Sequence, residues 1–131
     1  MRKKIAVFEV KSEGSISLKE ETVMKDQKAF IYCRVLSNRA RFLLDYQEDI
    51  LTDFAKGMGM KIKAIAKDVS DGKYFDSRGM QKLIYYIVNE KIDIVLIYDK
   101  TRINIYDDLF MEFMMLCHKH KILVMTSDIF V

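Results

Sequence analysis

Charged and hydroxyl-bearing side chains follow three apolar runs of the sequence. Arg34 and Ser37 end the first run, Asp68 ends the second, and Arg102 follows the third. A guanidinium group binds anions through paired hydrogen bonds. Arg34 lies within an apolar segment, where an unpaired charge is costly, so we expect it to pair with a carboxylate, and Asp68 is the candidate. The alternative use of Arg34 is contact with a phosphate or another anion.

Apolar runs of strand length alternate with segments of helical periodicity. This alternation predicts an α/β domain of three layers, in which a mainly parallel sheet has helices on both faces. Functional residues of such sheets collect at the carboxyl ends of the strands. Ser37 is expected to cap the helix that begins near Arg39. The expected strands are 29–36, 61–69, 92–98 and 122–125, and the expected helices are 39–56, 77–90 and 106–120.

Residues 1–28 precede this alternating pattern and differ from it. Two short runs, 4–10 and 16–24, have the character of strands, and a polar segment with Gly14 separates them. We expect an N-terminal β-hairpin extension over 1–28, attached to a main domain over 29–131. An exposed strand edge of this hairpin could pair with a strand of another protein.

Four motifs occur in order between residues 29 and 128. They are Tyr32-Cys33-Arg34-Val35, a helix from Gln47 to Gly59, Asp68-Val69-Ser70-Asp71-Gly72 followed by Arg78, and Ile92-Asp93-Ile94-Val95-Leu96-Ile97 followed by Arg102. Their order and spacing resemble the catalytic domain of the serine recombinases of the resolvase and invertase type. The resemblance implies the resolvase-like form of the α/β fold for this segment.

The resemblance also implies chemistry for particular residues. Serine recombinases cut DNA by serine attack on a backbone phosphate, which leaves a phosphoserine link, and arginines neutralise the phosphoryl transition state. Arg34, Arg78 and Arg102 match the family pattern, so the resemblance implies that they contact phosphate or DNA. Asp68 matches as well, and a supporting role is implied for it.

Three positions depart from the family pattern. Leu36 occupies the position of the nucleophilic serine, Thr101 that of an aspartate, and Ile105 that of an arginine. A leucine side chain cannot attack phosphorus, so these departures predict a protein without covalent catalysis. The alternative is a fragment of an active site-specific recombinase in which Ser37, the next residue along the chain, is the substitute nucleophile.

Serine recombinases continue beyond this domain into a long dimerisation helix and a separate DNA-binding domain. The sequence ends at Val131, so we expect both parts to be absent. The predicted function is therefore that of an inactive recombinase-like protein, acting as a regulatory or interaction module in DNA recombination or on a mobile element. Expected partners are the DNA backbone, an active recombinase or another protein. The sequence leaves both a monomer and an oligomer open.

Composition excludes several other classes of protein. Half of the residues are hydrophobic, the net charge is +3, and no apolar run approaches the ~20 residues of a membrane span, so we expect a cytoplasmic protein.

Cys33 and Cys117 lie in apolar patterns, which favours buried, reduced thiols. Cys117 with the two neighbouring histidines is too small a set for structural zinc, and we expect no metal and no cofactor. A receiver-like phosphoacceptor at Asp99 is an alternative, but the acidic pair that receivers need after the first strand is missing.

Overall fold

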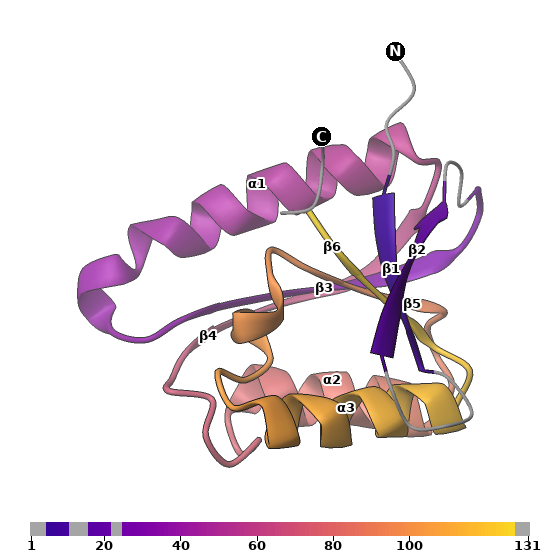
Figure 1. Cartoon of the computed structure of the whole chain (residues 1–131). Helices are drawn as coiled ribbons and strands as arrows, with labels where there is room; N and C mark the ends of the chain where they lie inside the picture. Colours follow the sequence, from indigo (N-terminus) through magenta and orange to yellow (C-terminus); the bar gives the residue numbers. More distant parts are fainter. Residues whose placement is uncertain (1–4, 11–15, 22–24, 128–131) are drawn as a thin grey trace.

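A computed structural model describes residues 5–10, 16–21 and 25–127, with side chains described within 25–127. One sheet of six strands forms the middle layer, in the order β2-β1-β6-β5-β3-β4. Helix α1 covers one face, and α2 and α3 cover the other (Figure 1). This arrangement confirms the predicted three-layer α/β fold. The strands are β1 (Ile5–Val10), β2 (Ile16–Glu21), β3 (Lys28–Val35), β4 (Lys61–Val69), β5 (Ile94–Ile97) and β6 (Leu123–Thr126), and the helices are α1 (Phe42–Gly57), α2 (Arg78–Val88) and α3 (Asp107–Lys119).

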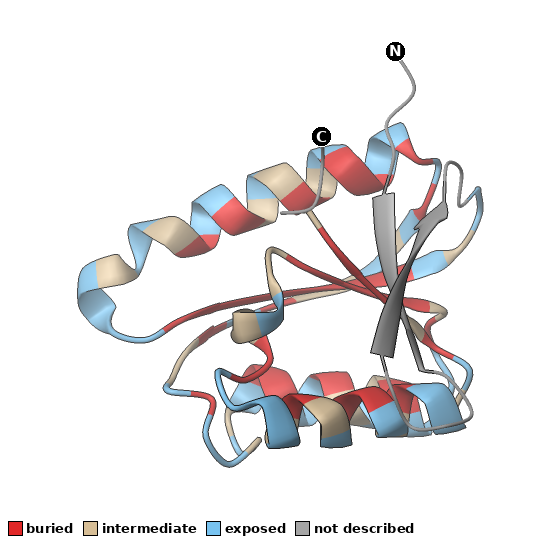
Figure 2. Ribbon diagram, viewed as in Figure 1, coloured by how far each residue is buried: buried red, intermediate tan, exposed pale blue. Residues whose placement is uncertain are grey.

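Four of the strands are parallel to one another. β3 pairs with β4 on one side and with β5 on the other, and β5 pairs with β6. The inner strands β3 and β5 are almost wholly buried because helices cover them on both sides (Figure 2). Continuous apolar runs are typical of strands in that position, which is why the sequence predicts them well.

The N-terminal hairpin exists but is not simply attached to the domain. β1 pairs with β2 in antiparallel fashion, as predicted, and its other edge pairs with β6, so that Ala6 lies opposite Thr126. The hairpin therefore extends the same sheet, because β6 offers an edge that β1 can cover. The turn and the last three residues of the expected strand 16–24 lie outside the described residues.

Each face of the sheet has its own apolar core. Phe54 and Leu51 of α1 pack on one face, and Leu83 of α2 and Phe113 of α3 pack on the other. Within the described residues, no helix is long and apolar enough to cross a bilayer. The two cores fix the ends of β3, β4 and β5, from which the loops with the candidate residues emerge.

Both thiols belong to these cores, as predicted. Cys33 and Cys117 are unpaired and fully buried. Burial raises the pKa of Cys33 to about 12, and burial also raises the pKa of Cys117.

Raised thiol pKa values predict a fold that weakens in mild alkali. The thiol of an unfolded cysteine has a pKa of about 8.5, so above that pH unfolding releases protons that the folded chain retains. Two such thiols lower the free energy of unfolding by about 1.4 kcal/mol between pH 8 and pH 9. Urea denaturation at both pH values measures this difference. The Cys33→Ala/Cys117→Ala variant should lose most of the dependence, and an unchanged slope would show that other groups cause it.

Candidate functional site

The carboxyl ends of β3, β4 and β5 form two hollows among the described residues. The first, which we call the β3 pocket, has a volume of about 210 Å³. The second, the β4 pocket, has a volume of about 680 Å³. The β3 pocket is lined by Arg34, Leu36, Asp71, Lys73, Thr101, Arg102, Ile105 and Tyr106. The β4 pocket is lined by Arg41, Leu44, Asp45, Lys67, Asp68, Val69 and Arg78.

Arg34 joins the loops that follow β4 and β5 to the end of its own strand with its guanidinium group. Its Nε donates to the carbonyl oxygen of Arg102 at 2.8 Å, and its Nη1 donates to that of Ser70 at 2.7 Å. Its Nη2 donates to the carbonyl oxygen of Thr101. The side chain is 4% exposed, and burial lowers its pKa. Backbone carbonyls thus provide the hydrogen bonds that a buried guanidinium group needs.

The expected ion pair between Arg34 and Asp68 is wrong. The two residues lie opposite each other in the register of β3 and β4, yet the arginine reaches forward to the loops beyond the strand. Asp68 is occupied by other donors. Three carbonyl oxygens at the end of the sheet satisfy Arg34, so it needs no carboxylate.

Asp68 instead caps the N-terminus of α2. Its Oδ1 accepts from the Gly79 N–H at 2.8 Å, and its Oδ2 accepts from the Met80 N–H at 3.1 Å. The hydroxyl groups of Tyr32 and Ser77 also donate to Oδ2, at 2.6 and 2.7 Å. A carboxylate at this place satisfies free N–H groups and interacts favourably with the helix dipole. Burial and the hydrogen bond to Asp68 raise the pKa of Tyr32.

Arg34 and Arg102 each donate a side-chain hydrogen bond to the backbone carbonyl oxygen of the other. The Nη1 of Arg102 donates to the carbonyl oxygen of Arg34 at 3.1 Å, and its Nη2 lies 3.5 Å from a carboxylate oxygen of Asp99. Its guanidinium carbon lies 5.7 Å from the ring centre of Tyr98. The two arginines of the β3 pocket are therefore held in fixed positions, with Arg102 the more exposed of the two.

Gln47 and Asn104 hold the same region and were not predicted as site residues. The side-chain amide of Gln47, 1% exposed on α1, accepts from the N–H of Arg34 and donates to its carbonyl oxygen, both at 3.1 Å. Asn104, 2% exposed, donates to the carbonyl oxygen of Gly72 at 2.7 Å and accepts from the N–H of Tyr106. A polar residue on an apolar helix face was the available signal for Gln47, while Asn104 lies in a loop without such a pattern.

Gly72 allows the loop after β4 to approach Arg34. Its φ is +70°, and a Cβ there would lie 2.9 Å from Nε of Arg34. Glycine adopts this backbone conformation without the strain that a side chain would bring. The Ser70–Gly72 segment can therefore wrap over the guanidinium group.

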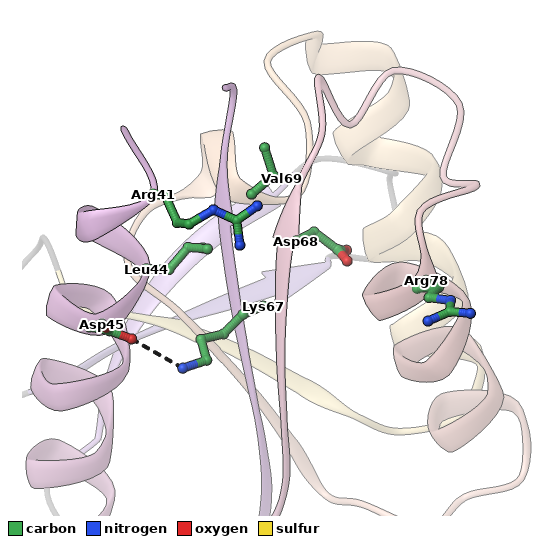
Figure 3. Close-up of a pocket in the computed structure, with 7 residues that line it drawn as sticks. All are labelled: Arg41, Leu44, Asp45, Lys67, Asp68, Val69 and Arg78. Atoms are coloured by element: carbon green, nitrogen blue, oxygen red, sulfur yellow. Dashed lines mark hydrogen bonds and ion pairs between the residues drawn. The ribbon is translucent and has the colours of Figure 1, made fainter. Parts of the chain in front are cut away.

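Arg78 lies at the β4 pocket, apart from Arg34 and Arg102. Figure 3 shows Arg41 and Lys67 on the α1 side of β4, and Arg78 at the start of α2 on the other side of the strand. Lys67 is paired with Asp45 at 3.2 Å and with Glu48 at 2.6 Å. Among residues 25–127, the side chain of Arg78 has neither a hydrogen-bond nor an ion-pair partner. The structure thus brings together two of the three arginines that the sequence singles out.

Ser37 is exposed at the tip of β3 and does not cap α1. Its side chain makes no capping hydrogen bond, and a 3₁₀ turn over Asn38–Ala40 separates it from α1, which begins at Phe42. The predicted cap and the predicted start near Arg39 are wrong, because the backbone carbonyl of Ser37 closes the short turn instead of opening the long helix. Ser37 is not among the residues that line either pocket.

The three positions that depart from the family pattern line one pocket. Leu36, Thr101 and Ile105 all contribute to the β3 pocket, together with Arg34 and Arg102. The side chains of Leu36 and Ile105 are 70% and 61% exposed. The hydroxyl of Thr101 is bound to Asp99, whose carboxylate also accepts from the Thr101 N–H and so caps the 3₁₀ turn Lys100–Arg102. Asp99 therefore serves the loop structure.

Metal ligands do not gather at these pockets. Over the described ranges, no three His, Cys, Asp or Glu side chains are placed to hold a metal ion. Cys117 faces the core, as its position in the helical pattern predicts, while the neighbouring His118 is exposed.

The fold matches the catalytic domains of serine recombinases. The chain resembles the C-terminal catalytic domain of ISC1926 TnpA, an IS607-like serine recombinase, with a TM-score of 0.72 and 27% identity over 77% of this chain and 70% of the other. It resembles the N-terminal catalytic domain of TP901-1 integrase with a TM-score of 0.65 and 32% identity over 75% of each chain. The first ORF of transposon ISC1904 from Sulfolobus solfataricus P2 has the same fold, with a TM-score of 0.66 and 22% identity over 77% of this chain and 67% of the other.

A family model confirms the resemblance seen in the sequence. The model described as Resolvase, N terminal domain, matches residues 29–129. The chain belongs to this family. The match begins at residue 29, one residue into β3, so it includes the four parallel strands and excludes the hairpin of β1 and β2. Because the chain belongs to this family, the alternative of a receiver-like protein with a phosphoacceptor at Asp99 is wrong.

Proposed function

We propose that this chain is a catalytically inactive serine-recombinase-like protein that acts as a regulatory or interaction module in DNA recombination. One observation carries the proposal: the residue that follows Arg34 and Val35 and lines the β3 pocket is Leu36, whose side chain is a hydrocarbon. A saturated hydrocarbon side chain has no lone pair with which to attack phosphorus. The loss of a cationic group at Ile105 removes further stabilisation of a phosphoryl transition state.

The bonding of the arginines supports a changed role for the pocket. Arg34 uses its guanidinium group to join loops, which is a structural task. Arg102 is partly exposed, and Arg78 has no described partner, so these two can still reach a phosphate. We therefore propose backbone contacts to DNA through Arg78 and Arg102, with Arg34 and Asp68 holding the loops in place.

A covalent-adduct assay tests the absence of catalysis. The protein is incubated with supercoiled plasmid, and nicked DNA and protein–DNA adducts that survive detergent are measured, beside an active serine recombinase on its own substrate. We expect neither product from this chain. The Ser37→Ala variant is the matched control for the alternative, in which Ser37 is the nucleophile. An adduct that forms with the unaltered chain and disappears in Ser37→Ala would overturn the proposal.

The interaction role has a separate measurement. Adding the protein to the reaction of an active serine recombinase should change the rate of recombination, because a module of this kind acts on the partner or on its DNA. A rate that stays constant at saturating protein would exclude that recombinase as the partner. The sequence predicts two kinds of partner, the DNA backbone and another protein. Direct measurements of binding to DNA and to the recombinase distinguish between them.

A further inference from the structure

Exposed hydrocarbons and unbalanced positive charge meet at the β3 pocket. Leu36 and Ile105 are among the most exposed large apolar side chains of the described residues, and Tyr106 beside them is 49% exposed. Exposed apolar groups that cluster at a hollow mark an interaction surface more often than isolated ones do. Leu36 follows β3, while Ile105 and Tyr106 lie in the loop after β5, and Arg34 links these two segments through hydrogen bonds to Thr101 and Arg102.

The charge around this apolar surface is mostly positive. Arg34, Lys73 and Arg102 line the pocket, against the single carboxylate of Asp71. Lys73 is exposed and makes no ion pair with a described residue; its ammonium group lies 5.2 Å from the ring centre of Tyr74. Asp99 balances part of the charge of Arg102. The pocket therefore favours an anionic ligand that also has an apolar part.

The aromatic side chains beside the pocket extend the surface towards α1. Arg102 lies against the ring of Tyr98, and Tyr98 lies 6.0 Å from the ring of Tyr46. Tyr46 is 51% exposed. This continuity gives a ligand longer than the pocket further apolar contacts.

We propose that the β3 pocket is a docking site for an acidic segment of another protein, anchored by an aliphatic or aromatic side chain. This inference deepens the proposed function and rests on it. The apolar anchor would contact Leu36, Ile105 and Tyr106, and the acidic residues would pair with Lys73 and Arg102. A DNA phosphate fits the pocket less well, because Leu36 and Ile105 would remove its hydration without offering a hydrogen bond in return.

A peptide binding assay tests this site directly. The probe is a short fluorescein-labelled peptide rich in glutamate with two leucines, and fluorescence anisotropy measures its affinity. Two comparison peptides carry serine in place of leucine, or lysine in place of glutamate. We expect the first peptide to bind at least about tenfold more tightly than either comparison, which corresponds to about 1.4 kcal/mol. Equal binding of the three peptides would overturn the proposal.

Variants place the binding on the surface. Ile105→Glu and Lys73→Glu should each weaken the peptide at least about tenfold, since each removes one of the two required features. The matched controls are Val88→Glu and Lys82→Glu on α2, which alter exposed side chains of the same types away from the pocket. Circular dichroism and thermal unfolding establish that all four variants fold. Peptide binding that is insensitive to Ile105→Glu would overturn the proposal.

Competition and self-association complete the test. Since Arg102 is also proposed to contact DNA, a duplex oligonucleotide should compete with the peptide through that residue, and Ile105→Ser should leave the affinity for the duplex unchanged. Duplex binding that Ile105→Ser weakens as much as it weakens the peptide would identify DNA as the ligand of the apolar surface and overturn the proposal. So would sedimentation of the chain as a dimer that Ile105→Glu dissociates, because the surface would then join two copies. Failure of peptide binding without any covalent DNA adduct removes this site alone, whereas an adduct removes the proposed function.

Discussion

The Arg34→Met variant is expected to lose about 3–5 kcal/mol of unfolding free energy. Methionine fills much of the same space but donates no hydrogen bond, so three carbonyl oxygens of the loops lose their partner. Hydrogen bonds to a charged donor contribute about 1.5–3 kcal/mol each, and water recovers part of this at the loop surface. Urea denaturation measures the loss, and amide hydrogen exchange should accelerate in residues 70–77 and 99–106.

Two further variants separate the guanidinium geometry from its charge. Arg34→Lys retains a cation but cannot donate in three directions at once, so we expect about half of the loss. Arg39→Met makes the same chemical change at an exposed arginine of the 3₁₀ turn, where the expected effect lies within about 0.5 kcal/mol. Arg34→Met as stable as Arg39→Met would contradict the structural role of Arg34.

Asp68→Ala is expected to cost about 3–5 kcal/mol as well, by a different route. The change leaves two N–H groups of α2 and the buried hydroxyl of Tyr32 without their acceptor. Loss of a helix cap costs about 1–2 kcal/mol, and each buried donor left unpaired adds about 1–3 kcal/mol. Thermal or urea denaturation measures the total. Asp76→Ala, an exposed carboxylate two residues before α2, should change stability by less than about 0.5 kcal/mol.

A double-mutant cycle shows whether Tyr32 contributes through Asp68. Tyr32→Phe alone should cost about 1 kcal/mol, because it removes one hydrogen bond. In the Asp68→Ala background the same change should restore part of the lost stability, since it removes a buried hydroxyl that has no acceptor. Strictly additive losses would contradict the contact as the source of the effect.

The space around Gly79 shows how closely the Asp68 carboxylate approaches the backbone of α2. A Cβ at this position would lie 2.6 Å from a carboxylate oxygen of Asp68. Alanine normally favours a helix over glycine by about 1 kcal/mol, so the close approach explains why this first turn contains glycine. The sequence gives no sign of the contact, because eleven positions separate the two residues.

The strands and helices of residues 29–127 follow from their apolar patterns. β4 matches its expected bounds of 61–69, and the buried runs of β3 and β5 lie where continuous hydrophobicity indicates. These elements could be predicted because burial on two faces leaves a strong local signal. The pairing of β1 with β6 could not, since it joins segments far apart in sequence and depends on which edge remains open.

The sequence predicted where the candidate site lies better than it predicted which hydrogen bonds its residues make. The strand ends do bring Arg34 and Arg102 together, as the rule for parallel sheets predicts. Which acceptor each donor takes depends on loop conformations of a few ångströms, for which the sequence has no periodic pattern. Arg34 therefore went to carbonyl oxygens instead of Asp68, and Arg78 remained apart, because α2 begins on the other side of β4.

The register between β1 and β6 has a consequence for synthesis on the ribosome. Ala6, among the first described residues to be made, lies opposite its partner in the sheet only when Thr126 has left the exit tunnel. Such distant partners make folding slow, because a long loop must close before the contact forms. β1 therefore cannot take its place in the sheet until β6 has been synthesised, and in that interval the edge of β1 that pairs with β6 has no partner in this sheet.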